Sequence, residues 1–429
     1  MRGYQQGFGN ELQSEAIPGA LPVGQNSPQQ PPLGLVSELV SGTTFSAPRA
    51  YNRRTYLFRI RPSVIHGAFV PMHHQTFLTP PLDVLPSLNQ LRWDPWPTPT
   101  GEQDFLDGMM TICGNGAPMD QVGMCMHVYR ATAPMKRRYF FNADGEMLII
   151  PDDGSLRVET EMGTMTLGPG ELGLVPKGIK FRASPQDGYA RGFVCENYGI
   201  PFRLPELGLI GSNGLANAID FEIPEAAYDV QEEPGKLIGK LCGRFWMADI
   251  GHSPLDVVAW RGNYLPYKFD MKRFVAMGTA TVDHPDPSIF CALTSPSSDV
   301  MGGNADFLIL PPRWLVAENS FRPPGFHRNC VAEFLAVVVG RHDAKAHGFR
   351  PGGASLHNHW SAHGPDAETF EMGRVAPLDP RKIEDSLVFM IETRRPLQIS
   401  TLAAESPELQ PDYRESWQGM RARFLEDDR

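Results

Sequence analysis

Apolar residues along this chain come in short runs, many of which alternate with polar residues. Such runs occupy residues 55–60, 147–150, 156–160, 307–310 and 334–339. Alternation with a period of two is typical of β-strands, because successive side chains point to opposite faces of a sheet. The 42 glycines and 40 prolines mark turns from end to end. Short strands at close spacing predict an all-β fold of sandwich or barrel type, with few short helices.

Two parts of the chain show this pattern most clearly, around residues 140–200 and 300–400. Each holds several apolar runs and a Gly-Pro corner, which predicts two stacked β-sandwich or jelly-roll units of the cupin type. We place an N-terminal β-rich domain at residues 1–275 and a C-terminal cupin-like domain at residues 276–429.

The two ends of the chain depart from the strand pattern. The first 50 residues are rich in Pro, Gly, Gln and Ser and cannot form a core alone. They predict an extended arm that wraps its own body or a neighbouring subunit, with disorder as the alternative. Residues 411–428 are the best helix candidate, because Tyr413, Trp417, Met420 and Phe424 recur at helical spacing. We interpret that apolar stripe as core packing.

Composition narrows the class of protein. A chain of 429 residues with 41% hydrophobic content can bury the cores of two domains. Its formal net charge of -10 argues against a nucleic-acid partner. No apolar run is long enough for a membrane-spanning helix, and the first ten residues lack the apolar stretch of a secretory signal. Six cysteines without paired spacing indicate reduced thiols and a cytoplasmic location.

Histidines are concentrated in the second half of the chain. Seven of the twelve lie between residues 284 and 363. Imidazoles near carboxylates, with few thiols, favour a His/carboxylate metal site over structural zinc. The alternative is that most of these histidines are hydrogen-bonded structural residues, as in a binding cupin without catalysis.

Two segments offer the donors of such a site. FHRNCVAEF contains His327 and Glu333. Two histidines and a carboxylate leave three adjacent coordination positions open, as non-haem iron(II) oxygenases require. In a straight strand these two residues would be about 20 Å apart, and in a helix they would point in different directions. The segment must therefore bend, with His327 in a loop and Glu333 entering the strand that follows.

The spacing of the residues does not decide which histidine is the third donor. SLHNHWSAHGPD offers His357, His359 and His363. From spacing alone the pair His357 and His359 ranks above His363, because residues two apart share one face of a strand. Further upstream, His284 lies between Asp283 and Pro285. It is a candidate general base held at a strand mouth, or a turn histidine that bonds the backbone.

Longer motifs are similar to one known family along nearly the whole chain. They include GFGNEL at 7–12, LVSGTTFSAPR at 39–49, GLIGSNGLANAIDF at 208–221, FRPPGFHRNCVAEF at 321–334 and HGPDAETFE at 363–371. By these motifs the chain resembles the homogentisate 1,2-dioxygenases.

The resemblance implies a ring-cleaving reaction and the residues that carry it out. It implies conversion of homogentisate and dioxygen to 4-maleylacetoacetate in tyrosine and phenylalanine catabolism. The implied iron(II) ligands are His327, Glu333 and His363, so His363 displaces the pair that spacing favours. His284 matches the family's acid/base residue, and His363 also lies on the substrate side. The family further implies two β-rich domains, iron in the second, and a homo-hexamer built as a dimer of trimers.

The sequence departs from the family pattern at the expected substrate-binding position. A tyrosine of the family's Gly-x-Tyr-Asp/Glu stretch is replaced by His342. A charged histidine can pair with a substrate carboxylate. The replacement also leaves open a dioxygenase of the same type that acts on another hydroquinone, such as gentisate. A second departure is His359, interpreted as solvent-facing, with a place beside the metal site as the alternative.

Overall fold

The computed structural model describes residues 3–206, 216–276, 281, 287–297, 302–342, 345 and 347–423. Strands form five sheets within these ranges, and the only α-helices there are α1 (Ala367–Val375) and α2 (Thr401–Ala404). The prediction of an all-β fold with few short helices is therefore confirmed. Short 3-10 helices cover Pro32–Gly34, Pro118–Asp120, Ala218–Asp220, Met271–Arg273, Pro287–Phe290 and Tyr413–Trp417 (η7).

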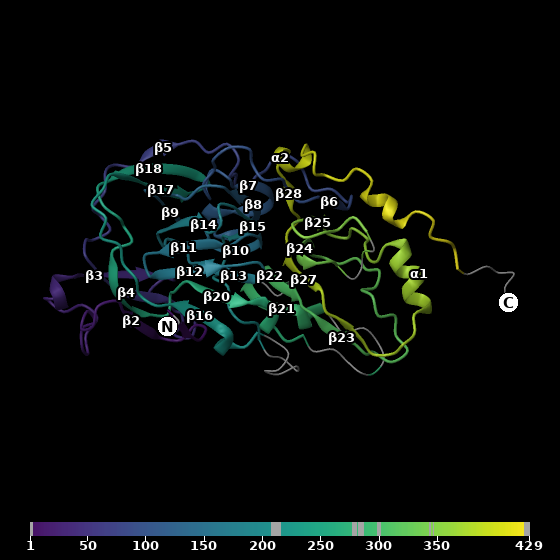
Figure 1. Cartoon of the computed structure of the whole chain (residues 1–429), viewed down its shortest axis with the longest axis horizontal. Coiled ribbons are helices and arrows are strands. Elements are labelled where there is room, and N and C mark those ends of the chain that lie inside the picture. Colours follow the sequence, from purple (N-terminus) through teal and green to yellow (C-terminus); the bar gives the residue numbers. More distant parts are fainter. Residues whose placement is uncertain are drawn as a thin grey trace.

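Two large sheets form the central part of the molecule (Figure 1). The nine-stranded sheet has the order β1 (Tyr4–Gln6), β16 (Phe221–Pro224), β20 (Tyr267–Asp270), β13 (Glu171–Val175), β10 (Glu146–Asp153), β15 (Ala190–Asn197), β8 (Val122–Ala131), β7 (Met110–Ala117), β28 (Gln398–Ile399). The seven-stranded sheet has the order β12 (Gly163–Leu167), β11 (Leu156–Thr160), β14 (Phe181–Pro185), β9 (Arg138–Asn142), β17 (Gly235–Leu241), β18 (Arg244–Ile250), β5 (Val70–Met72).

Three smaller sheets flank them. A four-stranded sheet has the order β2 (Leu12–Glu15), β19 (Val257–Gly262), β4 (Arg54–Arg59), β3 (Val36–Ser41). A six-stranded sheet has the order β21 (Cys291–Pro296), β22 (Gly303–Leu310), β27 (Ser386–Thr393), β24 (Ala332–Gly340), β25 (Ala354–His357), β6 (Leu91–Trp93). A two-stranded sheet pairs β23 (Arg313–Leu315) with β26 (Arg381–Ile383).

Burial follows the pattern of the sequence. In β11, Leu156, Val158 and Thr160 are buried while Arg157 and Glu159 are partly exposed, because one face of the strand meets solvent. In β24, every residue from 332 to 338 is buried, because the six-stranded sheet is covered on both faces. One of these faces packs on the nine-stranded sheet through edge-to-face contacts of Phe193 with Phe334 and Phe389.

The two halves of the chain exchange strands. β6, from the first hundred residues, forms the edge of the six-stranded sheet beside β25. β28, from near the end of the chain, pairs with β7 at the edge of the nine-stranded sheet. The indole of Trp93 in β6 is fully buried and donates a hydrogen bond to the carbonyl of Ala403 (2.8 Å). The halves are thus interlocked, and each completes a sheet of the other.

The N-terminal arm packs on its own chain. Its strands β1, β2 and β3 pair with β16, β19 and β4 in turn. These strands of the arm therefore wrap its own body, as one of the alternatives predicted, because their backbone groups find partners along strands already present.

The predicted helix over residues 411–428 is wrong in its described part. Only the 3-10 helix η7 forms, and residues 418–423 are not helical. Gly419 adopts φ +82°, a left-handed conformation that ends a right-handed helix. Residues 424–428 lie outside the described residues.

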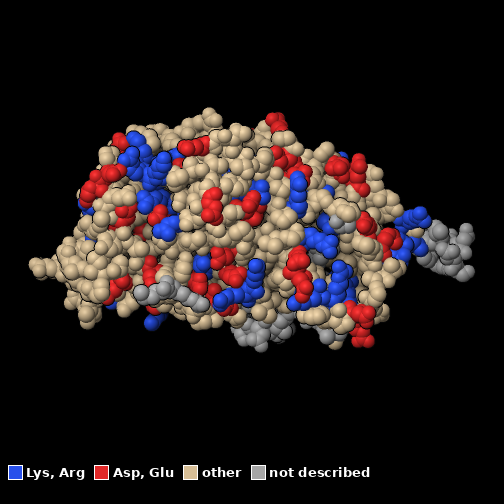
Figure 2. Space-filling model, viewed as in Figure 1, with Lys and Arg blue, Asp and Glu red and all other residues tan. Residues whose placement is uncertain are grey.

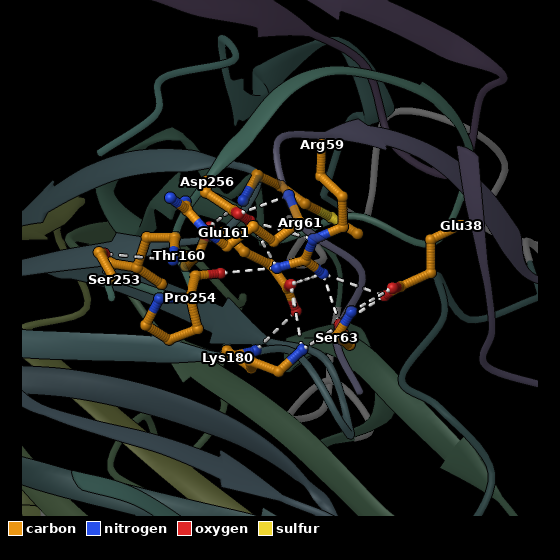
Figure 3. A network of polar contacts seen from close by, with 12 residues as sticks. Glu38, Arg59, Arg61, Ser63, Thr160, Glu161, Lys180, Ser253, Pro254 and Asp256 are labelled. Atoms are coloured by element: carbon orange, nitrogen blue, oxygen red, sulfur yellow. Dashed lines mark hydrogen bonds and ion pairs between the residues drawn. The ribbon is translucent and has the colours of Figure 1, made fainter. Parts of the chain in front are cut away.

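A buried arginine joins the four-stranded sheet to the seven-stranded one (Figure 3). Arg59 of β4 is 1% exposed and lies 2.8 Å from Asp256, 3.0 Å from Glu161 and 3.0 Å from Glu38. Its Nη2 also donates to the carbonyl of Pro254 (2.8 Å). Several hydrogen bonds to carboxylates offset the desolvation of the buried guanidinium.

On the face of the molecule seen in Figure 2, charged side chains of both signs are mixed. Within the described ranges, no helix has the length and apolar content needed to span a membrane.

Candidate metal centre

Three donor side chains converge at the start of β24. Glu333 is the second residue of that strand and pairs with His357 of β25 on one side. His327 lies in the loop before β24 and His363 in the loop after β25. The predicted bend between His327 and Glu333 is confirmed, because the chain turns between residue 327 and the strand. Reciprocal backbone hydrogen bonds (2.9 and 3.1 Å) hold His327 and His363 side by side.

The donor atoms lie within coordinating reach of one another. Nε2 of His363 is 2.9 Å from Oε2 of Glu333, and Nε2 of His327 is 3.6 Å from Oε1. One donor atom from each of the three residues lies within 4.8 Å of the other two. A metal ion with ligand distances of about 2 Å fits between donors at this spacing. Among the described residues, these three form the group that could hold a metal ion.

Hydrogen bonds orient both imidazoles. Nδ1 of His327 donates to the carbonyl of Gly325 (2.9 Å), and Nδ1 of His363 donates to the carbonyl of Ser361 (2.8 Å). A proton on Nδ1 leaves the Nε2 lone pair for a metal, and both Nε2 atoms face Glu333. Nδ2 of Asn329 donates to Oε1 of Glu333 (2.5 Å) and fixes the carboxylate. All three donor side chains are thus held by hydrogen bonds, as is usual for the ligands of a metal centre.

The site is enclosed on one side and open on the other. The side chains of Glu333 and His363 are 6% and 8% exposed, whereas that of His327 is 43% exposed. Small molecules can therefore approach from the side of His327.

The electrostatics of the three residues are coupled. Burial opposes ionisation of Glu333, but its hydrogen bonds with His327 and His363 outweigh burial and lower its pKa. The same carboxylate raises the pKa of His327 above the ordinary value of 6.5. Without a metal, the group therefore favours a carboxylate beside a protonated imidazole.

Metal affinity is expected to fall as the solution is acidified. A metal must displace the proton of His327, and its raised pKa makes the proton a competitor at pH values above 6.5. Below that pKa, we expect the affinity for Co²⁺ to drop about tenfold per pH unit for one proton released. Equilibrium dialysis of the metal-free protein between pH 5 and 8 measures this, and equal affinity at both limits contradicts it.

The other two histidines of the second segment lie outside this group. His357 ends β25 with its imidazole stacked on that of His363, with centroids 4.0 Å apart, and its Nε2 bonds the hydroxyl of Tyr413 (3.1 Å). Burial, and then His363, lower its pKa well below 6.5. The spacing preference for His357 and His359 fails because the strand ends at His357, so alternation no longer places His359. His359 is half-buried, and its Nε2 atom is shielded from solvent.

Two more histidines were predicted for the site, His342 and His284. His342 is buried and lies two residues beyond the C-terminal end of β24, whereas Glu333 is near the start of that strand. The ring centroid of His342 is 6.0 Å from that of Phe349. His284 lies outside the described residues. Sequence reasoning missed the contribution of Asn329, although it lies within the FHRNC segment, and of Tyr413, which its apolar spacing assigned to the core.

Comparison with known proteins covers nearly the whole chain. The family model described as "Homogentisate 1,2-dioxygenase N-terminal" matches residues 3–271, and "Homogentisate 1,2-dioxygenase C-terminal" matches residues 272–424.

Similarity to solved structures is distant. Protein Ylba from E. coli is 9% identical over 74% of this chain and 96% of its own, with a TM-score of 0.32. AerE from Microcystis aeruginosa is 6% identical over 72% and 98%, with a TM-score of 0.28. An oxalate decarboxylase is 11% identical over 70% and 79%, with a TM-score of 0.24.

The two family models follow each other directly and leave only the ends of the chain unmatched. The sequence motifs and the His/Glu/His group agree with this match. The chain belongs to the homogentisate 1,2-dioxygenase family of ring-cleaving enzymes.

Proposed function

We propose that His327, Glu333 and His363 hold one iron(II) ion, at which this chain converts homogentisate and dioxygen to 4-maleylacetoacetate. The observation that carries the proposal is the convergence of these three donors, with both Nε2 atoms facing one carboxylate. Two imidazoles and a carboxylate are the donor set of non-haem iron(II) oxygenases. When bound, open-shell iron supplies a route by which triplet dioxygen reacts with a closed-shell aromatic ring.

Residues around the three donors hold the donor side chains in place and leave one side of the site open to substrate. The carbonyls of Gly325 and Ser361 hold the two imidazoles, and Asn329 holds the carboxylate, so the donors need little reorganisation. Glu333 and His363 close the buried side, while the exposed side at His327 admits substrate and dioxygen. His363 borders the substrate as well as the metal.

Two further residues complete the proposal. His284 accepts the proton of a ring hydroxyl as general base. His342 pairs with the substrate carboxylate in place of the family's tyrosine. The support for both roles is the motif match, DHPDPSIF at 283–290 for His284 and the stretch from Gly340 for His342.

The wider setting is proposed on the same resemblance. We place the iron in a domain of residues 276–429, after an N-terminal domain of residues 1–275, because all three donors follow residue 276. We further propose a cytoplasmic homo-hexamer, a dimer of trimers. All six cysteines are free thiols, which suits a reducing compartment. Light scattering on the purified protein tests the assembly.

Anaerobic metal reconstitution tests the reaction. The metal-free protein is loaded with iron(II) or zinc(II), and oxygen uptake is recorded with homogentisate or gentisate. We expect one dioxygen consumed per homogentisate with iron, none with zinc, and slower uptake with gentisate. Equal activity of the metal-free protein would refute the iron centre, and faster turnover of gentisate would refute the substrate.

A further inference from the structure

Three side chains from two segments distant in sequence, residue 345 and the 3-10 helix η7, lie beside the loop that carries His363. We call Lys345, Tyr413 and Trp417 the C-terminal clasp. Nζ of Lys345 donates to the carbonyl of Gly364 (2.7 Å), and Nε1 of Trp417 donates to the carbonyl of Pro365 (2.9 Å). The carbonyls of the two residues that directly follow His363 are therefore each hydrogen-bonded to the clasp.

The clasp is itself packed as a unit. The ammonium of Lys345 lies 4.5 Å from the ring centre of Trp417 and 5.3 Å from that of Tyr413. The guanidinium of Arg92, in β6, lies 4.3 Å from the ring centre of Tyr413. Cations over aromatic faces attract in buried surroundings, and Lys345 and Tyr413 are only 7% and 2% exposed.

One imidazole connects the clasp to the ring of His363. The hydroxyl of Tyr413 is 3.1 Å from Nε2 of His357, whose ring stacks on that of His363 with centroids 4.0 Å apart and planes at 19°. The hydrogen bond to Tyr413 restricts rotation of the His357 ring. The stacked ring in turn restricts rotation of His363.

We propose that Tyr413 is a positioning residue that acts through His357 to set the orientation of the His363 imidazole, while Lys345 and Trp417 set its backbone. The inference rests on the proposed role of His363 as a metal ligand. Partners that orient a ligand typically contribute 10- to 100-fold, as an order of magnitude, to metal affinity. It also gives a reason why Tyr413 is the buried residue of η7, with its hydroxyl directed at His357.

Tyr413→Phe in the full chain removes the hydroxyl and keeps the ring. We expect the affinity for Co²⁺ to fall about tenfold and the visible absorption bands of bound Co²⁺ to shift as the His363 ring reorients. A purely structural role would lower the unfolding temperature of the metal-free protein and leave the bands in place. Trp417→Phe, which removes the indole N–H, provides the same readout should the first variant fail to fold.

Tyr139→Phe is the matched control. Tyr139 is 2% exposed and lies beneath a guanidinium, that of Arg182 (5.8 Å), but belongs to β9 of the seven-stranded sheet. Its Co²⁺ spectrum is expected to equal that of the wild type. Wild-type bands and affinity in Tyr413→Phe would overturn the role of Tyr413, and the same result in Trp417→Phe would overturn the role of the backbone contact. Failure of the wild type to bind Co²⁺ would instead overturn the metal centre.

Discussion

Glu333→Ala is expected to lose bound iron and to lower kcat/KM with homogentisate by more than about 100-fold, beyond what loss of a ligand's hydrogen-bond partner costs. Its carboxylate is the one group that faces both imidazoles, at 2.9 and 3.6 Å. Without it, two neutral nitrogens remain and no anion balances the ion. His327→Ala is expected to behave alike. Metal analysis and oxygen uptake measure both effects.

Two further substitutions serve as comparisons for Glu333→Ala. His347→Ala changes an exposed histidine (84%) whose Nε2 lies 3.2 Å from the surface carboxylate of Glu368, and we expect wild-type iron content and activity. His284→Ala is expected to keep iron and turn over slowly, since that residue is proposed to move a proton and not to bind the metal. Stoichiometric iron and full activity in Glu333→Ala would refute the ligand assignment.

Arg59→Met is expected to lower the free energy of unfolding by about 3–5 kcal/mol, the usual effect of removing one member of a buried ionic group. The guanidinium is 1% exposed, and its loss leaves Glu161 and Asp256, 1% and 0% exposed, with less compensation for their charge. Urea denaturation of both proteins at the same protein concentration measures the change.

An exposed ion pair supplies the comparison for Arg59. Arg137 and Glu233 form a pair at 2.6 Å with side chains 56% and 59% exposed. Arg137→Met is expected to cost about 1 kcal/mol or less, because solvent screens the pair. Equal effects of the two substitutions would show that burial does not determine the contribution of Arg59.

Local sequence pattern determined much of this protein. Alternation located the strands, such as β11 with its buried Leu156 and Val158. The length from His327 to Glu333 required a bend, and the structure has it. The family motifs pointed to His363 and to the chemistry. These conclusions hold because strand periodicity, chain reach and motif identity are properties of contiguous residues.

Tertiary structure alone decided the rest. Alternation assigns a face only while a strand lasts, so it could not show that β25 ends at His357, before His359. The exchange of β6 and β28 between the two halves, and the burial of Tyr413 against His357, depend on contacts between segments far apart in the chain. Such contacts are selected by packing of the whole molecule, and no local spacing encodes them.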